Sequence, residues 1–155
     1  MSAGTDAAAG RVREMLERIA NAAGVDATVE VHDADDGLHA EFVGEDLGVL
    51  IGRHGETIDA IQHLAYRIAG HGGADRVSVL VDAAGYRERR ATTLRATADQ
   101  AAQQAISGRR AVSLDAMSAL ERKVIHEHLK SRHDVETYSE GQEPSRYLVV
   151  APLVD

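Results

Sequence analysis

Hydrophobic residues in the first part of the chain have the spacing of an amphipathic helix and then of two strands. Residues 11–22 place apolar side chains three or four positions apart and are followed by a glycine, which predicts a helix. Segments 27–31 and 38–42 alternate apolar and polar residues, and Asp33–Gly37 between them is typical of a hairpin turn. The apolar positions are Val12, Met15, Leu16 and Ile19 in the helix and Ala27, Val29, Val31, Leu38, Ala40 and Phe42 in the strands.

A helical segment interrupted by a glycine loop follows the hairpin. Asp46–Ile51 predicts a short apolar turn of helix, and Glu56–Ala69 predicts a longer helix with apolar residues at helical spacing. The glycines of Gly70–Gly73 end this helix, and residues 76–81 (RVSVLV) predict a third strand. The order is therefore helix, strand, strand, helix, loop, helix, strand.

The second half of the chain predicts a separate set of elements. A long helix from Ala84 to Ile106 carries arginines 87, 89, 90 and 95 on its outer side, and a short strand follows at 111–114. The sequence Ser-Ala-Leu-Glu at 118–121 is a capping box that begins a helix reaching about residue 131. Segments 135–138 and 147–150 then flank a polar turn and predict a hairpin.

These elements indicate an α+β fold with two small domains. We expect residues 1–10 to be a disordered tail, residues 11–83 to form the first domain and residues 84–155 to form the second. The second domain has the predicted order helix, strand, helix, strand, strand.

Composition and charge change the picture in one respect. The chain has 155 residues, 44% of them hydrophobic, and no cysteine, which excludes disulfides and thiolate chemistry and suits a reducing cytoplasm. We find no apolar run of membrane-spanning length and expect a cytoplasmic protein without membrane insertion. The net charge of -8 disfavours phosphate binding, but residues 51–110 hold nine basic and six acidic residues. Because local field matters more than total charge, the acidity does not exclude nucleic acid.

The stretch from Leu50 to Ile58, LIGRHGETI, has two interpretations. The sequence RHGET resembles the phosphoacceptor site of histidine phosphatases and phosphoglycerate mutases, with His54 as nucleophile, whereas Ile-Gly-x-x-Gly-x-x-Ile resembles the loop of a K-homology (KH) domain. A phosphatase needs its histidine at the end of the first strand of a parallel sheet. Here a predicted hairpin, and hence antiparallel pairing, precedes the loop, which favours the KH interpretation.

The loop has the chemistry of a phosphate site. Gly52 and Gly55 allow a tight turn and close approach of a phosphodiester, and the N-terminus of the next helix favours an anion. Arg53 can bind phosphate through its guanidinium, and His54 can donate a hydrogen bond or stack. The helix-strand-strand-helix-loop-helix-strand order resembles a type II KH domain.

Arg122 and His126 lie four residues apart on a predicted helix and hence on one face. The hairpin after them contains Ser-x-Gly-x-x-x-x-Arg ending at Arg146, and the combination resembles the R-three-H domain, named for its Arg-x-x-x-His signature. In that interpretation Arg122 would bind a phosphate, and His126 would form a hydrogen bond or stacking contact to a base or sugar. The alternative is that Arg122 pairs with an acidic neighbour and His126 serves local packing.

A KH domain followed by an R-three-H domain is similar to the Jag family (SpoIIIJ-associated, also called KhpB or EloR) of bacterial RNA-binding proteins. Longer members carry an N-terminal Jag domain and a charged linker, which we do not find in this sequence. The resemblance implies a post-transcriptional regulator linked to growth or envelope biology that binds single-stranded RNA, with single-stranded DNA as the alternative. A small single-KH protein or a second copy of the chain is the implied partner. The implied nucleic-acid-binding residues are Gly52, Arg53, His54, Gly55, Arg122, His126 and Arg146.

The remaining histidines invite a metal interpretation that the spacing does not favour. The sequence His126-Glu-His128, with His133 nearby, does not have the His-Glu-x-x-His spacing of zinc proteases, and no convincing third ligand accompanies the pair. We expect surface histidines, no metal, no cofactor and no catalysis. The competing functions are an enzyme of the histidine phosphatase class and a protein-interaction module.

Overall fold

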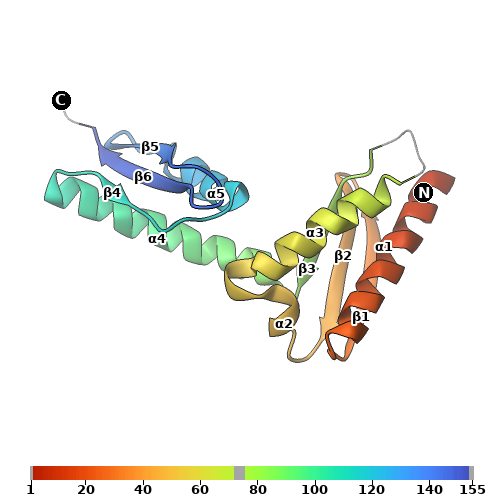
Figure 1. The fold of residues 1–155 in the computed structure, drawn as a ribbon. Coiled ribbons are helices and arrows are strands. Elements are labelled where there is room, and N and C mark those ends of the chain that lie inside the picture. The colour runs from red at the N-terminus through yellow and green to blue at the C-terminus, as the bar shows by residue number, and fades with distance from the viewer. Residues whose placement is uncertain (1, 72–75, 154–155) are drawn as a thin grey trace. The chain divides into compact units, whose positions relative to one another are not determined.

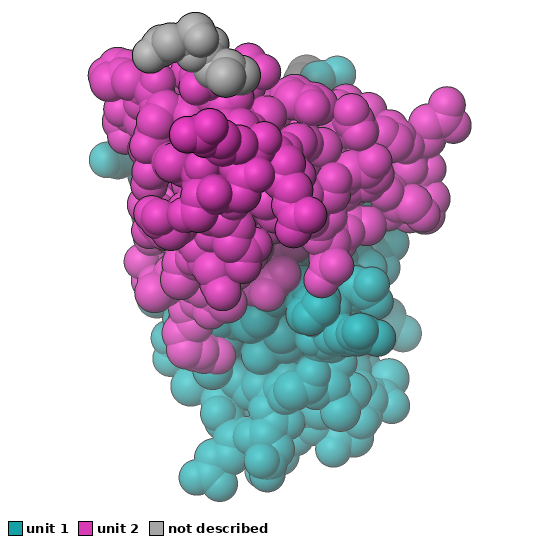
Figure 2. Space-filling model, turned by 90° about the vertical axis from the view of Figure 1, so that its left-hand side faces the viewer, with its two compact units in different colours: residues 1–87 teal, residues 88–155 magenta. Residues whose placement is uncertain are grey.

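The computed structural model describes residues 2–71 and 76–153, and the chain divides into two compact units, residues 1–87 and 88–155 (Figure 1, Figure 2). Unit 1 contains α1 (Ala3–Ala22), β1 (Ala27–Ala34), β2 (Gly37–Gly44), α2 (Gly48–Ile51), the 3-10 turn η1 (Arg53–Gly55), α3 (Glu56–Ala69) and β3 (Val79–Ala83). The boundary lies in the first turn of α4 (Tyr86–Gly108), and unit 2 continues with β4 (Val112–Ser113), α5 (Ala119–Leu129), β5 (Val135–Glu140) and β6 (Tyr147–Pro152). The predicted α+β class and both element orders are confirmed.

Unit 1 is a three-stranded mixed sheet covered on one face by two helices (Figure 1). The strand order is β1-β2-β3, with β1 antiparallel to β2 and β3 parallel to β2. Every second residue of β2 is buried, and these side chains meet the apolar stripes of α1 and α3. The alternation in the sequence therefore set which face of the hairpin is covered.

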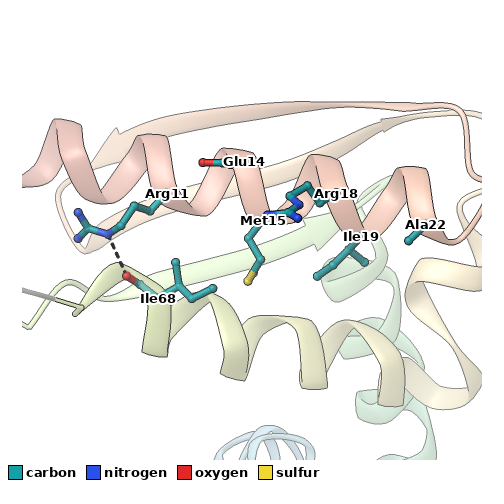
Figure 3. A pocket seen from close by; sticks show the side chains of 7 residues that line it. All are labelled: Arg11, Glu14, Met15, Arg18, Ile19, Ala22 and Ile68. Atoms are coloured by element: carbon teal, nitrogen blue, oxygen red, sulfur yellow. Dashed lines mark hydrogen bonds between the residues drawn. The ribbon is translucent and has the colours of Figure 1, made fainter.

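Arg11 joins the two helices that cover this sheet. Its Nε and terminal nitrogen donate to the carbonyl oxygens of Ile68 and Ala69, at 3.1 and 2.8 Å, and so satisfy carbonyls at the C-terminal end of α3. An open groove of about 530 Å³ runs between the helices, with Met15 and Ile19 along it (Figure 3).

The expectation of a disordered tail at residues 1–10 is wrong for the part of it that the structure describes. Helix α1 begins at Ala3, where the Ser2 side chain accepts a hydrogen bond from the Thr5 amide at 3.3 Å. Ala8 is fully buried, in the same stripe as Val12. Alanine shows little contrast in a hydrophobicity pattern, yet it has the highest helix propensity, so periodicity alone missed this turn of helix.

The third strand lies further along the chain than the pattern predicted. Segment 76–81 was expected, whereas β3 spans Val79–Ala83 and pairs with β2 from Leu38↔Val79 to Phe42↔Ala83. Register with a partner strand, rather than local apolar content, sets these limits. The predicted helix stop at Gly70–Gly73 lies partly outside the described residues, and Gly70 is the C-cap of α3.

Unit 2 packs two helices on one face of an antiparallel sheet ordered β4-β6-β5. The core side chains come from α4, α5 and the inner faces of β5 and β6. The buried members are Leu94, Ala98, Ala101, Ala102, Ala105, Ile125, Leu129, Val135, Leu148 and Val150. Within the described part of the chain, no helix combines the length and hydrophobicity needed to cross a membrane.

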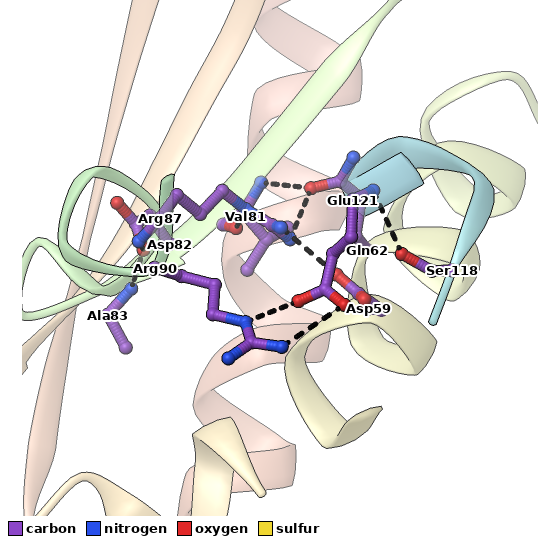
Figure 4. A network of polar contacts seen from close by, with 9 residues as sticks. All are labelled: Asp59, Gln62, Val81, Asp82, Ala83, Arg87, Arg90, Ser118 and Glu121. Carbon is purple, nitrogen blue, oxygen red and sulfur yellow. Dashed lines mark hydrogen bonds and ion pairs between the residues drawn. The ribbon is translucent and has the colours of Figure 1, made fainter. Parts of the chain in front are cut away.

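Two of the four arginines predicted on the outer side of α4 point inward. Arg87, in unit 1, donates to the Val81 carbonyl oxygen at 2.8 Å, to Asp59 at 3.0 Å and to Gln62 at 2.9 Å (Figure 4). In unit 2, Arg90 pairs with Glu121 at 2.6 Å (Figure 4). Both guanidinium groups are mostly buried, so they bind protein rather than solvent.

Because the N-terminal residues form a helix with one buried face, we expect substitutions of two adjacent alanines to differ in their effect on stability. Ala8→Asp places an unpaired carboxylate in the core of unit 1 and should lower the free energy of unfolding by about 3 kcal/mol. Ala7→Asp, at an exposed position of the same helix, should change it by about 0.5 kcal/mol or less. Urea denaturation followed by circular dichroism measures both, and equal effects would contradict the packing of this turn.

Candidate nucleic-acid interface

The loop between α2 and α3 has a backbone conformation that glycine allows. Gly52 has φ 74° and ψ 179°, a region almost restricted to glycine, and Gly55 has φ 78° and ψ 12°. His54, between them, is also left-handed at φ 52°. Three positive φ values within four residues turn the chain sharply from α2 into α3.

Packing also requires glycine at both positions. A Cβ atom on Gly52 would lie 2.2 Å from the Thr57 hydroxyl oxygen, and one on Gly55 would lie 2.7 Å from a ring carbon of Tyr86. The sequence suggested that these glycines leave room for a ligand. The structure shows that they also leave room for Thr57 and Tyr86, so the protein's own packing needs them whether or not a ligand is bound.

The two residues inside the loop face solvent. Arg53 and His54 are exposed, and neither forms a side-chain hydrogen bond or ion pair with any residue that the structure describes. Helix α3 begins at Glu56, after the N-cap residue Gly55, and has no side-chain cap, so the positive end of its dipole lies beside the loop without a capping group. The exposed carboxylate of Glu56 makes the electrostatic potential at this helix end less positive, and the positive charge of Arg53 offsets that effect.

This geometry excludes the phosphatase interpretation of His54. The histidine follows α2 rather than a strand, and the two strands before it pair antiparallel. A phosphohistidine site at the end of the first strand of a parallel sheet therefore has no counterpart among the residues of unit 1 that the structure describes.

The second predicted site surrounds the start of α5. The Ser118 side chain caps this helix by accepting from the Glu121 amide at 3.3 Å, as the capping box predicted. Arg122 follows in the first turn. Its Nε donates to the Met117 carbonyl oxygen at 3.3 Å, and its guanidinium pairs with Glu143 in the β5–β6 turn.

His126 and Arg146 complete this second site. His126 is exposed one turn after Arg122, with its Nδ1 2.5 Å from the Thr137 hydroxyl oxygen on β5. Arg146 donates to the Gly141 carbonyl oxygen at 2.7 Å, so it contacts the same β5–β6 turn as Arg122. The structure thus brings Arg122 and Arg146 to one turn and holds the His126 ring at the edge strand β5.

Other cations of unit 2 differ in their availability. Lys123 and Lys130 are exposed. His128 contacts Asp99 at 2.9 Å, and Arg132 contacts Asp134 at 2.8 Å, which lowers the pKa of the Asp134 carboxyl group. The histidines do not gather with other ligand residues: the described residues contain no group of three that could hold a metal ion.

Sequence reasoning missed the partner of Arg122. Glu143 lies 21 residues further along the chain, and only the folding of the hairpin against α5 brings its carboxylate to the guanidinium. The alternative in which Arg122 pairs with an acidic neighbour predicted such a pair but did not identify the residue. The Ser-x-Gly-x-x-x-x-Arg segment that contains Glu143 was the only available signal.

Comparison with known families defines the class of this protein. Residues 10–81 match the family model of the KhpA/KhpB KH domain, and residues 92–152 match that of the R-three-H domain. The chain therefore belongs to the class of proteins that join a KH domain to an R-three-H domain. Both predicted sites lie within the matched residues, the glycine loop in the first range and the α5 site in the second.

Curated relatives identify the family. The RNA-binding protein KhpB of Lactiplantibacillus plantarum is 48% identical over 104 residues, and those of Clostridium symbiosum and Bacillus subtilis are 34% and 31% identical over 140 and 138 residues. The chain belongs to the KhpB, or Jag, family, as the resemblance of its motifs predicted. The three matches cover 67%, 89% and 88% of this chain, and 32%, 63% and 66% of the relatives.

The packing of Gly55 in the glycine loop predicts that its substitution costs more stability than substitution of a left-handed glycine with open space around it. Gly24 and Gly55 have similar left-handed conformations, at φ 70° and 78°, but a Cβ on Gly24 would meet open space. Gly24→Ala should therefore cost about 1 kcal/mol, from backbone strain alone. Gly55→Ala adds the clash with Tyr86 and should cost about 3 kcal/mol. Urea denaturation of the two variants measures the difference, and equal losses would contradict the close packing of Tyr86.

Proposed function

We propose that this protein binds single-stranded RNA through two sites and acts as a cytoplasmic post-transcriptional regulator. The observation that carries the proposal is the loop of unit 1, where Arg53 and His54 are exposed and unpaired among the described residues at an uncapped helix N-terminus. Family membership supports it, because the curated relatives are named RNA-binding proteins. The link to growth or envelope biology rests on the family resemblance alone.

In unit 1 the ligand group would be the phosphodiester backbone. A phosphate placed at Gly52–Gly55 would accept hydrogen bonds from the loop and from the N-terminus of α3, and Arg53 would add a charged contact. His54 would contact the neighbouring sugar or base. Such contacts position a strand without reading its sequence, so we expect relaxed sequence preference.

In unit 2 the proposed contacts are His126, Arg146 and Arg122. His126 and Arg146 are accessible at the edge strand and the β5–β6 turn, whereas Arg122 reaches a phosphate only when its pair with Glu143 opens. Each unit alone offers few cations. Linking two weak sites in one chain raises the effective concentration for the second contact, which offsets the modest charge of each.

A second KH protein is the partner that we propose in addition to RNA. The family model that matches unit 1 is shared by KhpA and KhpB, which supports a small single-KH protein or a second copy of the chain. Single-stranded DNA remains the competing ligand, and comparison of matched RNA and DNA oligonucleotides separates the two through the 2′-hydroxyl.

The loop variant Arg53→Asp with His54→Asp should weaken binding of a single-stranded RNA oligonucleotide by about tenfold or more, because it places two carboxylates where phosphate would lie. Aspartate tolerates the left-handed conformation at position 54, so the fold should persist. Fluorescence anisotropy at several salt concentrations measures the affinity.

The matched control is His63→Asp with Arg67→Asp on the exposed face of α3. It makes the same chemical changes in the same unit, and we expect less than about a threefold loss from its general electrostatic effect. Equal losses for the two double variants would show that charge rather than the loop determines binding.

The contribution of unit 2 can be measured at its exposed histidine. His126→Ala should weaken RNA binding by roughly fivefold, the effect of about 1 kcal/mol expected for one stacking or hydrogen-bonding contact. His133→Ala removes another exposed histidine of the same unit and should leave the affinity unchanged. If both variants bind like the wild type, His126 does not contact the ligand.

A further inference from the structure

Arg122 combines burial with a surface counterion in an unusual way. Its side chain is 9% exposed, and it is the one buried charged residue among those that the structure describes. Its anionic partner, Glu143, is 58% exposed and lies in a turn whose residues 141–145 are all exposed. The positive charge of Arg122 is therefore buried in unit 2, whereas the negative charge of Glu143 lies at the protein surface.

This asymmetry makes the anion the replaceable member of the pair. A guanidinium largely removed from water needs a counterion, because an uncompensated buried charge is strongly destabilising. An exposed carboxylate, by contrast, loses little free energy when it returns to solvent. Arg122 also keeps its contact with the Met117 carbonyl oxygen, which does not depend on Glu143. The position beside Arg122 is thus a built anion site whose occupant can be exchanged.

Phosphate and carboxylate are alternative ligands for such a site. Both present paired oxygens that match the guanidinium fork. The exchange breaks and forms hydrogen bonds only, and it moves the Glu143 side chain from Arg122 into water.

We propose that Glu143 occupies the anion site of Arg122 in the free protein and competes there with a phosphate of the bound RNA. This inference rests on the proposed function and assigns Glu143 an inhibitory role. Because Arg122 is already neutralised, its contact with RNA adds less affinity than a free arginine would add. Glu143 therefore sets the affinity of unit 2.

The test compares two charge-matched substitutions in the full chain. Glu143→Gln keeps the size of the side chain but removes its charge, and it should tighten binding of a single-stranded RNA oligonucleotide by about three- to tenfold. Glu136→Gln makes the same charge change at an exposed position on β5, and it should alter affinity by less than about twofold. Thermal unfolding checks that both variants remain folded.

Arg122→Gln completes a double-mutant cycle. If the gain from Glu143→Gln acts through Arg122, it should disappear in the Arg122→Gln background. A Glu143→Gln variant that binds RNA no better than Glu136→Gln, or binds it more weakly, would overturn the inference and leave the pair with a role in holding the β5–β6 turn.

A second readout separates this inference from the proposed function. Inorganic phosphate is added to the protein while the NMR signal of the Arg122 Nε–H is monitored. The signal should shift at a lower phosphate concentration in Glu143→Gln than in the wild type. If the wild type does not bind RNA, the proposed function fails, and this phosphate response still decides whether the anion site exists. An unchanged phosphate response contradicts the site directly.

Discussion

The close packing of the Gly55 backbone against the Tyr86 ring is the constraint on which the glycine loop of unit 1 depends. It leaves no room for a side chain at Gly55 and places the left-handed turn before α3 directly against the start of α4. The next residue, Arg87, binds Asp59 and Gln62 of α3, so backbone packing and a polar network hold the same region together. The exposed Arg53 and His54 therefore lie in a loop whose conformation is fixed by the packing of Tyr86 and the contacts of Arg87.

The two proposed sites are built on different physical principles. In unit 1 the site consists of backbone conformation and an uncapped helix terminus, and its side chains are free in the described structure. In unit 2 the site consists of side chains that already have partners, since Arg122 binds Glu143 and His126 binds Thr137. A ligand would meet an open surface in the first case and would replace an internal contact in the second. This difference explains why the same kind of cation has different availability in the two units.

The sequence predicted features that depend on local periodicity and turn chemistry. The alternation in residues 27–42 predicted two strands joined in a hairpin, and the capping box at Ser118 predicted the start of α5. The predicted tail failed because alanine provides little contrast, and β3 was displaced because its limits depend on the register with β2. The family itself followed from two short motifs whose order along the chain is informative.

The sequence by itself determined the order of elements, the Gly52–Gly55 loop and the shared face of Arg122 and His126, because each depends on residues within a few positions of one another. Only the tertiary structure decided which charged side chains are free. Arg87, Arg90 and Arg122 have the same chemistry as Arg53, yet their partners come from segments brought together by packing. Such pairings are long-range contacts that no local pattern encodes, and they determine which arginines a ligand can reach.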